Sequence, residues 1–449
     1  MLLCAKWVIP IIGEPILNGA LHISDDTITR LGTREELKKD LPRECEIDFG
    51  QAVIMPGFVN THTHIELSVL HGLIKPSPFT PWILQLIEKA RKLSLKDWEI
   101  SASFGACMSI KSGITCIGDI ATRSPNLKAL CESGLRGIVF AEVIEMDEAK
   151  IDDAIVNVTH KVELWKDECK GSLLNIGIAP HSLYTVHPLL IKKLSRWARR
   201  EGLPLSMHLA ESQDETLYVR DGKGGLAQQY RQFLGWAHLP VKGTGVSPTR
   251  YAEQLGVLDG LIAAHSVQVN REDIPLLKDH NVTVAHCPQS NSYLKVGIAP
   301  VIDLMNKGIP VGLGTDSLAS NEDMDFFKEM RRLYLSQWEK TGTAKTILHR
   351  KMLEIATLGG ARVLKVENKV GSLEVGKQAD VIAVKPSRPI HLTEDLFSYL
   401  VDEARNEDVI FNMVAGKTLF HEGIRLIPDM EEITTQMKNI QLYHLSALK

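Results

Sequence analysis

The stretch Pro56-Gly57-Phe58-Val59-Asn60-Thr61-His62-Thr63-His64 runs from an apolar segment into a pair of histidines. The apolar part, bounded by Pro and Gly, predicts a buried β-strand. His62 and His64 are two residues apart, so on a strand their side chains point to the same side. Two imidazoles on one side can bind a single metal ion. Two histidines with this spacing also occur in ordinary strands, so whether they bind a metal ion depends on the rest of the chain.

The chain that follows alternates short apolar runs with helical segments, which is typical of βα units and a parallel sheet. Eight such runs are predicted strands, and eight is the number that a (β/α)₈ barrel needs. The predicted strands are residues 57–60, 115–120, 137–143, 174–179, 203–207, 260–264, 282–285 and 309–314. The predicted fold class is therefore α/β, with a TIM-type barrel at its centre.

Both ends of the chain instead show short strands separated by turns. We expect residues 1–55 and 366–449 to combine into one small β domain, the latter range including a tail. Residues 56–365 then form the barrel. Residues 214–256 are a long insertion after the fifth strand, and they are a candidate lid because long loops in compact domains are usually functional.

Composition excludes several classes of protein. The 449 residues are 44% hydrophobic and 24% charged, which is enough apolar material for a large core. With 51 Lys+Arg against 55 Asp+Glu, the net charge of −4 excludes a globally basic nucleic-acid binder. No apolar run predicts a membrane span, and the N-terminus does not resemble a signal peptide. Seven cysteines without a Cys-x-x-Cys pattern favour reduced thiols and a cytoplasmic protein.

Polar residues recur where the predicted strands end. His208 follows the fifth strand, with Glu211 three residues later, and His265 follows the sixth. His286 follows the seventh, and Asp316 closes the eighth. Because strand carboxyl ends in a barrel converge on one face, residues about 250 apart in the sequence are expected to lie together.

His62, His64, His208 and Asp316 would supply three nitrogens and one oxygen to a metal ion. This set leaves positions free for water, which is the arrangement of a catalytic rather than a structural site. Imidazole ligands suit Zn, Fe, Co or Mn.

Four further residues each allow two interpretations. Glu211 is a proton shuttle beside an activated water, or an acid that stabilises a helix N-terminus. His265 is a base that polarises the substrate, or an ordinary residue at a strand end. His181, at the end of the fourth strand, contacts substrate or is a satisfied loop histidine. For His286 the two interpretations are evenly matched.

Four motifs taken together resemble the amidohydrolase superfamily. They resemble most the branch that holds S-adenosylhomocysteine/methylthioadenosine deaminases and chlorohydrolase-like enzymes. The motifs are residues 56–64, 208–212, 286–291 and 314–321. Residues 371–381 resemble the segment that begins the family's C-terminal β domain. The resemblance covers nearly the whole chain and implies a metal-bearing (β/α)₈ barrel with a β-sandwich split between the two chain ends.

Within this branch the resemblance implies one divalent metal ion, Zn²⁺ in the first place and Fe²⁺ or Mn²⁺ as alternatives. Its ligands match His62, His64, His208 and Asp316. His181 stands where members with two metal ions carry a carboxylated lysine, and this favours a site with one ion.

The same resemblance assigns chemistry to residues around that ion. It implies that Glu211 protonates a ring nitrogen while His265 and Asp316 hold and deprotonate the attacking water. Glu66 contacts substrate or orients a metal ligand. The predicted catalytic residues are Glu211, His265 and Asp316. The predicted substrate-binding residues are His181, Glu211, Glu66 and Ser317.

The predicted function is hydrolytic deamination of an adenine-type nucleoside, in which metal-bound hydroxide attacks the amino-bearing ring carbon and ammonia leaves. Residues 64–68 and 79–83 resemble aminodeoxyfutalosine deaminases; methylthioadenosine and adenosine are the other expected substrate classes. Arg136 matches one arginine that binds the carboxylate in S-adenosylhomocysteine deaminases. Glu142 stands about where a second positive charge would be, which disfavours that substrate.

Two alternatives stay open. One is the same chemistry on guanine, cytosine or a triazine, including loss of chloride, and the other is a non-catalytic scaffold protein. The expected partner is a small-molecule substrate, without nucleic acid or membrane, and the family also suggests a homo-oligomer.

Overall fold

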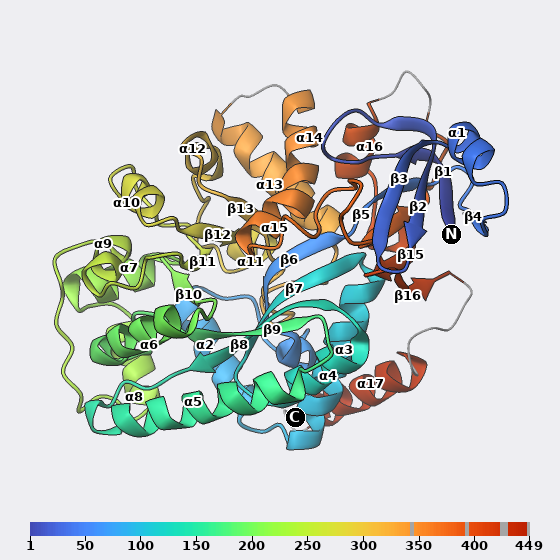
Figure 1. Cartoon of the computed structure of the whole chain (residues 1–449). Coiled ribbons are helices and arrows are strands. Elements are labelled where there is room, and N and C mark those ends of the chain that lie inside the picture. The colour runs from blue at the N-terminus through green and yellow to red at the C-terminus, as the bar shows by residue number, and fades with distance from the viewer. Residues whose placement is uncertain (342–344, 391–394, 423–429, 447–449) are drawn as a thin grey trace.

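Two groups of strands organise the computed structural model, which describes residues 1–341, 345–390, 395–422 and 430–446. The middle of the chain forms two four-stranded parallel sheets, and both chain ends contribute to one eight-stranded sheet. In Figure 1 the blue strands of the N-terminal part lie beside the red strands of the C-terminal part.

The two parallel sheets have the strand orders β6-β7-β8-β9 and β10-β11-β12-β13. Isolated bridges from Ile178 to Leu205 and from Thr63 to Asp316 join the sheets at both edges. The strands are β6 (Phe58–Thr63), β7 (Ile114–Ala121), β8 (Arg136–Val143), β9 (Leu174–Pro180), β10 (Ser206–Leu209), β11 (Ile262–His265), β12 (Thr283–His286) and β13 (Val311–Leu313). Each predicted strand overlaps one of them, and the predicted α/β class is confirmed.

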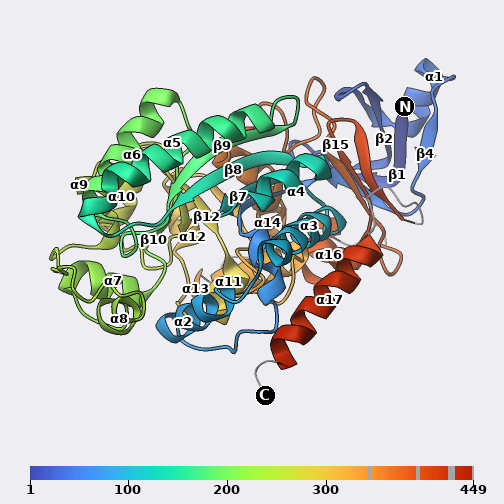
Figure 2. The ribbon, with the colours of Figure 1, turned by 90° about the horizontal axis from the view of Figure 1, so that it is seen from below.

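Helices follow the strands and cover the outer side of the sheets (Figures 1 and 2). Their ends follow local sequence rules: Ser94 caps α3 in a capping box with Asp97, and Gly202 ends α6 in the left-handed conformation. The α-helices are α2 (Phe79–Ala90), α3 (Leu95–Lys111), α4 (Pro125–Ser133), α5 (Ile151–Glu168), α6 (Pro188–Glu201), α7 (Gln213–Asp221), α8 (Arg231–Phe233), α9 (Pro248–Gln254), α10 (Asp273–Asp279), α11 (Pro288–Tyr293), α12 (Val301–Asn306), α13 (Phe326–Thr341), α14 (Lys345–Glu354) and α15 (Gly360–Val363). Short 3₁₀ and π segments are η1 (Ile65–Leu70), η2 (Glu148–Lys150), η3 (Leu226–Tyr230), η4 (Ile355–Gly359) and η5 (Asn406–Asp408).

The eight-stranded sheet confirms that strands from the two chain ends pair with each other. Its order is β16-β15-β14-β5-β1-β2-β3, and β4 pairs with β1. The antiparallel pairing of β14 with β5 joins the two ends of the chain. The strands are β1 (Leu2–Val8), β2 (Ile16–Ser24), β3 (Thr27–Thr33), β4 (Glu46–Asp48), β5 (Val53–Pro56), β14 (Val381–Val384), β15 (Val409–Val414) and β16 (Lys417–His421).

Three helices belong to the chain ends: α1 (Arg34–Asp40), α16 (Leu396–Asp402) and α17 (Met430–Ser446). Helix α17 packs against α3 and η1, as Figure 2 shows for α3. Gln441 Nε2 of α17 donates to the carbonyls of Val69 and His71 at 3.3 and 3.2 Å. Among the described residues, no helix is both long and apolar enough to cross a membrane.

A buried ion pair ties β8 to the eight-stranded sheet. Arg136 donates from Nε and Nη2 to the carboxylate of Asp380 at 2.9 and 3.1 Å, and both side chains are buried. Asp380 also accepts from the backbone N–H of Ala415 at 2.8 Å. The match of Arg136 to a substrate-binding arginine is therefore wrong. Arg136 begins β8, at the strand end remote from the site, and its charge is used in holding the two sheets together.

Replacement of Arg136 by Met is expected to lower the free energy of unfolding by about 3–5 kcal/mol, because Asp380 is left as a buried charge without its partner. Urea or thermal unfolding measures the change. The matched control is Lys92→Met, which breaks an exposed pair with Glu88 and should cost less than about 1 kcal/mol. A loss in Arg136→Met no larger than in this control would contradict the prediction.

Candidate active site

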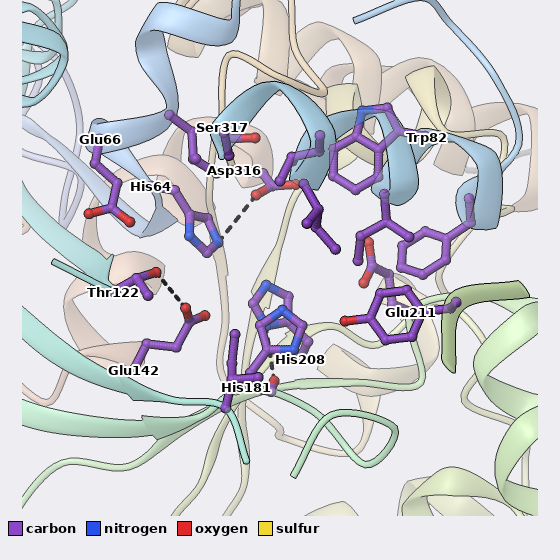
Figure 3. Close-up of a pocket in the computed structure, with 18 of the residues that line it drawn as sticks. His64, Glu66, Trp82, Thr122, Glu142, His181, His208, Glu211, Asp316 and Ser317 are labelled. Atoms are coloured by element: carbon purple, nitrogen blue, oxygen red, sulfur yellow. Dashed lines mark hydrogen bonds and ion pairs between the residues drawn. The ribbon is translucent and has the colours of Figure 1, made fainter. Parts of the chain in front are cut away.

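A cavity of about 300 Å³ opens at the carboxyl ends of the parallel strands (Figure 3). Every predicted substrate-binding residue lines it, namely His181, Glu211, Glu66 and Ser317. Its lining also includes the charged or polar side chains of His64, Arg91, Thr122, Arg123, Glu142, His208 and Asp316.

One wall of the cavity is apolar and comes mainly from helix α2. Phe79, Trp82 and Ile87 of this helix line it, and Tyr184 and Tyr230 add further aromatic surface. Trp82 is held by a hydrogen bond from Nε1 to the carbonyl of Ala319 at 2.9 Å. A wall of aromatic faces suits a flat heterocyclic ring.

Five predicted site residues meet beside the cavity. Ligand atoms of His62, His64 and His208 lie within 4.8 Å of one another, and so do those of His62, His265 and Asp316. His62 of β6, His208 of β10 and His265 of β11 meet there with His64, which directly follows β6, and with Asp316 in the segment after β13. All five side chains are buried.

Hydrogen bonds across the edge between β6 and β13 hold the histidines of β6 against Asp316. Thr61 Oγ1 donates to the carbonyl of Leu313 at 2.8 Å, and Thr63 Oγ1 donates to that of Asp316 at 2.9 Å. The backbone N–H of Asp316 donates to the carbonyl of His62 at 3.0 Å. The alternate residues of this strand therefore fix its register, while His62 and His64 face the cluster.

The two oxygens of Asp316 have different surroundings. Oδ2 accepts from Ser290 Oγ at 2.6 Å and Ser320 Oγ at 2.9 Å. Oδ1 faces Nε2 of His64 at 3.6 Å and of His62 at 3.8 Å. Burial alone would raise the pKa of Asp316, but His265 and the other imidazoles bring it below its usual value. One oxygen is thus fixed while the other stays available to a metal ion or a proton.

The histidine nitrogens fit a metal ion. Both ring nitrogens of His62 are buried and have no hydrogen-bond partner among the described residues, which is costly unless another group satisfies them. His208 donates from Nδ1 to the carbonyl of His181 at 3.1 Å and so directs Nε2 into the cluster. Burial lowers the pKa of His62 and His208 well below the usual histidine value. They are therefore neutral, as ligands must be.

Glu211 lines the cavity just beyond β10 and is buried. Burial raises its pKa well above the usual value, and the charge of Asp316 adds to the effect. The backbone N–H of Glu211 donates to Glu215 Oε2 at 2.7 Å, and that of Ala210 donates to Oε1 at 3.2 Å. Glu215, which the sequence analysis missed, thus positions the turn that carries Glu211. A protonated Glu211 can give a proton to a ring nitrogen.

His265 is oriented by a residue from the next unit of the fold. Its Nδ1 lies 2.9 Å from Oδ1 of Asn291, so Nδ1 carries the hydrogen. Nε2 is buried, lies 3.7 Å from Glu211 Oε1, and has no hydrogen-bond partner within the ranges of the chain that the structure describes. The lone pair of Nε2 therefore faces the reaction space. Residues 286–291 form one of the motifs that resemble the family, but no local sequence pattern predicts that Asn291 orients His265.

His265 and Asp316 both have backbones in the left-handed region, with φ of 67° and 54°. Such conformations cost about 1–3 kcal/mol each in residues other than glycine and are enriched at functional sites. Both residues stand where their strand ends and the chain turns into the site.

The two remaining histidines differ in position. His181 lines the cavity, and its Nδ1 is held by Thr185 Oγ1 at 2.8 Å. His286 lies outside both metal-binding groups, and its Nδ1 is 3.3 Å from the carbonyl of His265. Burial lowers the pKa of His286 to about 4.

Glu66 is buried in η1 at the edge of the cavity. Its Oε2 accepts from the backbone N–H of Arg123 at 3.2 Å, and its Oε1 pairs with Arg123 Nη1 at 3.4 Å. Burial raises the pKa of Glu66 and the charge of Arg123 opposes this. Arg123 lies between β7 and α4 and was not singled out in the sequence, where no local pattern marks it.

The insertion at residues 214–256 folds into ordered helices instead of an open loop. It contains most of α7 together with η3, α8 and α9. Tyr230 of η3 reaches the cavity, and Asp214 accepts from the backbone and hydroxyl of Thr80 at the start of α2. The insertion therefore supports the apolar wall.

Comparisons with known proteins agree with this geometry. A sequence model described as the amidohydrolase family matches residues 53–419. The chain is 31% identical over 435 residues to the 5-methylthioadenosine/S-adenosylhomocysteine deaminase of Moorella thermoacetica, and the match covers 96% of each chain.

Two solved structures have the same fold. One is an adenosine deaminase from Xanthomonas campestris with bound zinc, with a TM-score of 0.85, 24% identity, and coverage of 99% of this chain and 98% of that chain. The other is the aminofutalosine deaminase of Helicobacter pylori in complex with methylthio-coformycin. Its TM-score is 0.80 at 21% identity, with 93% of this chain and 99% of that chain covered.

Proposed function

The chain belongs to the amidohydrolase family and is a hydrolytic enzyme, and from this we propose that it is a metal-dependent deaminase of an adenine-type nucleoside. The observation that supports the proposal best is the buried cluster of His62, His64, His208 and Asp316 beside Glu211. The name of the Moorella thermoacetica relative supports the adenine nucleoside class.

We assign one divalent ion, Zn²⁺ in the first place, to His62, His64, His208 and Asp316. Two observations support this set: the nitrogens of His62 have no hydrogen-bond partner among the described residues, and Oδ1 of Asp316 faces Nε2 of both His62 and His64. When bound, such an ion lowers the pKa of water from about 15.7 toward about 7 and so supplies hydroxide at neutral pH.

The protein's own groups then guide the reaction. The aromatic wall holds the ring in place, and Glu211 delivers a proton to the ring nitrogen next to the amino-bearing carbon. His265 Nε2 and Asp316 Oδ1 hold the attacking water, and one of these two groups takes a single proton from it. That proton passes to the departing amino group, so collapse of the tetrahedral carbon releases ammonia. The remaining hydroxyl proton restores the carboxyl group of Glu211. His181 and Ser317 line the cavity and contact the substrate in this proposal.

The finer features of the fold belong to the same proposal. The bridges at both sheet edges support a closed (β/α)₈ barrel over residues 56–365. Residues 1–55 and 366–449 would form the small β domain, of sandwich type in this family. A homo-oligomer and a cytoplasmic location stay predictions from the sequence.

Ammonia release from purified protein of known metal content tests the function. The panel holds aminodeoxyfutalosine, methylthioadenosine, adenosine, S-adenosylhomocysteine, guanine, cytosine and a chlorotriazine. Turnover of one adenine nucleoside with kcat/KM near about 10⁴ M⁻¹s⁻¹ or above is expected. Turnover of guanine, cytosine or the triazine alone would replace the substrate class. No turnover with about one ion bound per chain would discard the purine preference.

Metal removal with a chelator is expected to abolish ammonia release while the protein stays folded, because most of the fold does not depend on the ion. Stoichiometric Zn²⁺ should restore turnover, and parallel additions of Fe²⁺ and Mn²⁺ rank the metals. Circular dichroism monitors folding in the same samples. Full activity of metal-free protein would contradict the assignment of the ion.

A further inference from the structure

Two carboxylates face the cavity on the side away from Glu211. Figure 3 shows Glu66 and Glu142 on one side, and Glu211 with Trp82 on the other. A nucleoside whose ring lies at the metal cluster and Glu211 must extend its sugar elsewhere in the same cavity. The two carboxylates are therefore candidates to meet the part of the substrate that the reaction does not change.

Glu66 already has protein partners on both oxygens. The backbone N–H and guanidinium of Arg123 occupy them, and the guanidinium carbon also lies 4.1 Å above the ring of Trp98. The charges of this pair largely cancel. Glu66 thus has little remaining capacity to accept hydrogen bonds from a ligand.

Glu142 is different because one of its oxygens is unused. Oε2 accepts from Thr122 Oγ1 at 2.6 Å. Oε1 is buried and has no hydrogen-bond partner in the part of the chain that the structure describes. The nearby Lys161 ammonium donates instead to the carbonyls of Thr122 and Ala121, at 2.9 and 3.4 Å.

The strand geometry directs Glu142 inward. Along β8, alternate side chains point to opposite faces, so Glu142 shares a face with Ile138 and Phe140. These two belong to an interior cluster with Val59 of β6 and Ile262 of β11. Glu142 is thus the last inward-facing residue of its strand, at the end where the cavity opens.

A buried carboxylate oxygen without a donor is costly, and a ligand donor would relieve that cost. Building on the proposed function, we propose that Glu142 binds a hydroxyl of the substrate's sugar through Oε1 and thereby selects intact ribose. The shared chemistry is a neutral hydroxyl donor. The 2′ and 3′ hydroxyls, which all the proposed adenine nucleosides carry, are the sources that the experiment distinguishes, and 5′-deoxyadenosine is the analogue that keeps both.

The experiment measures kcat/KM for adenosine and for 2′-deoxy-, 3′-deoxy- and 5′-deoxyadenosine with the metal-loaded enzyme. The native protein should lose roughly 10- to 100-fold with the analogue that lacks the bound hydroxyl, as expected for a hydrogen bond to a charged acceptor. Glu142→Ala should lose a similar factor with adenosine and nothing further with that analogue. This coupling is a readout that a merely structural role of Glu142 would not produce.

Two further variants sharpen the result. Glu142→Gln keeps the contact with Thr122 and an acceptor oxygen, so it should retain more activity on adenosine than Glu142→Ala. Glu148→Gln removes an exposed carboxylate of η2 outside the cavity lining and should match the native protein on all four substrates.

Two results would overturn the inference while leaving the proposed function standing. One is equal turnover of all four nucleosides by the native protein, and the other is an equal loss on all four in Glu142→Ala. A native, metal-loaded protein that deaminates none of the four and none of the other adenine nucleosides in the ammonia-release panel would instead count against the proposed function as well.

Discussion

Replacement of His208 by Ala is expected to abolish metal binding and reduce ammonia release to the background of the assay. His208 directs Nε2 into the cluster because its Nδ1 is held by the carbonyl of His181. Without it, the group that includes His62 and His64 loses one of three nitrogens. Without a bound ion, the pKa of water is not lowered, and hydroxide is scarce at neutral pH. Elemental analysis and ammonia assays on the same preparation measure both effects.

His71→Ala is the control, because His71 is exposed, directly follows η1 and belongs to neither group of possible metal ligands. It should bind metal and turn over like the native protein. Thermal unfolding shows whether His208→Ala is folded. A folded His208→Ala protein with a full complement of metal would remove His208 from the ligand set.

Replacement of Glu211 by Gln is expected to lower kcat by roughly 10²–10⁴-fold, the range for loss of a general acid, with metal content unchanged. Glu211 is buried, and burial raises the pKa of its carboxyl well above the usual value, so it can carry a proton. Glutamine keeps the size of the side chain but cannot transfer that proton. Steady-state kinetics and elemental analysis measure the two quantities separately.

Glu211→Asp separates chemistry from shape. It keeps a carboxyl group that is one methylene shorter, so its turnover should lie between those of the native protein and Glu211→Gln. Near-native turnover in Glu211→Gln would contradict the proton-transfer role. Loss of metal in that variant would instead assign Glu211 to the metal site.

The strands were predictable because their residues carry local information. Parallel strands buried on both faces are mostly apolar, and β7 and β8 are, with Asp119 as the one charged residue inside β7 and with Arg136 and Glu142 near the two ends of β8. The exact ends of the strands were less predictable. The first predicted strand stops at residue 60, whereas β6 continues to Thr63. Thr61 and Thr63 bond to chain about 250 residues away, and no local pattern encodes those partners.

Site residues also differ in how well the sequence predicts them. Histidines at strand ends are visible in the sequence, since each follows an apolar run. Asn291 and Glu215 act only through a residue that they orient, so their roles depend on the neighbour that folding supplies. For Arg136 the sequence predicted a role that the residue does not have. It was matched to a substrate-binding arginine, but it pairs with Asp380, which lies 244 positions away in the chain and is not marked by any local pattern.

By itself, the sequence determined the α/β alternation, the pairing of the two chain ends and the set of residues from which the site is built. Apolar periodicity and residue chemistry are local properties, so they can be identified from the sequence alone. The tertiary structure alone decided which atoms are left without partners. Oε2 of Glu142 is satisfied and Oε1 is not, while both oxygens of Glu66 are taken by Arg123. That difference arises from side chains brought together by separate strands, because hydrogen-bond capacity is used up by neighbours in space and not by neighbours in the chain.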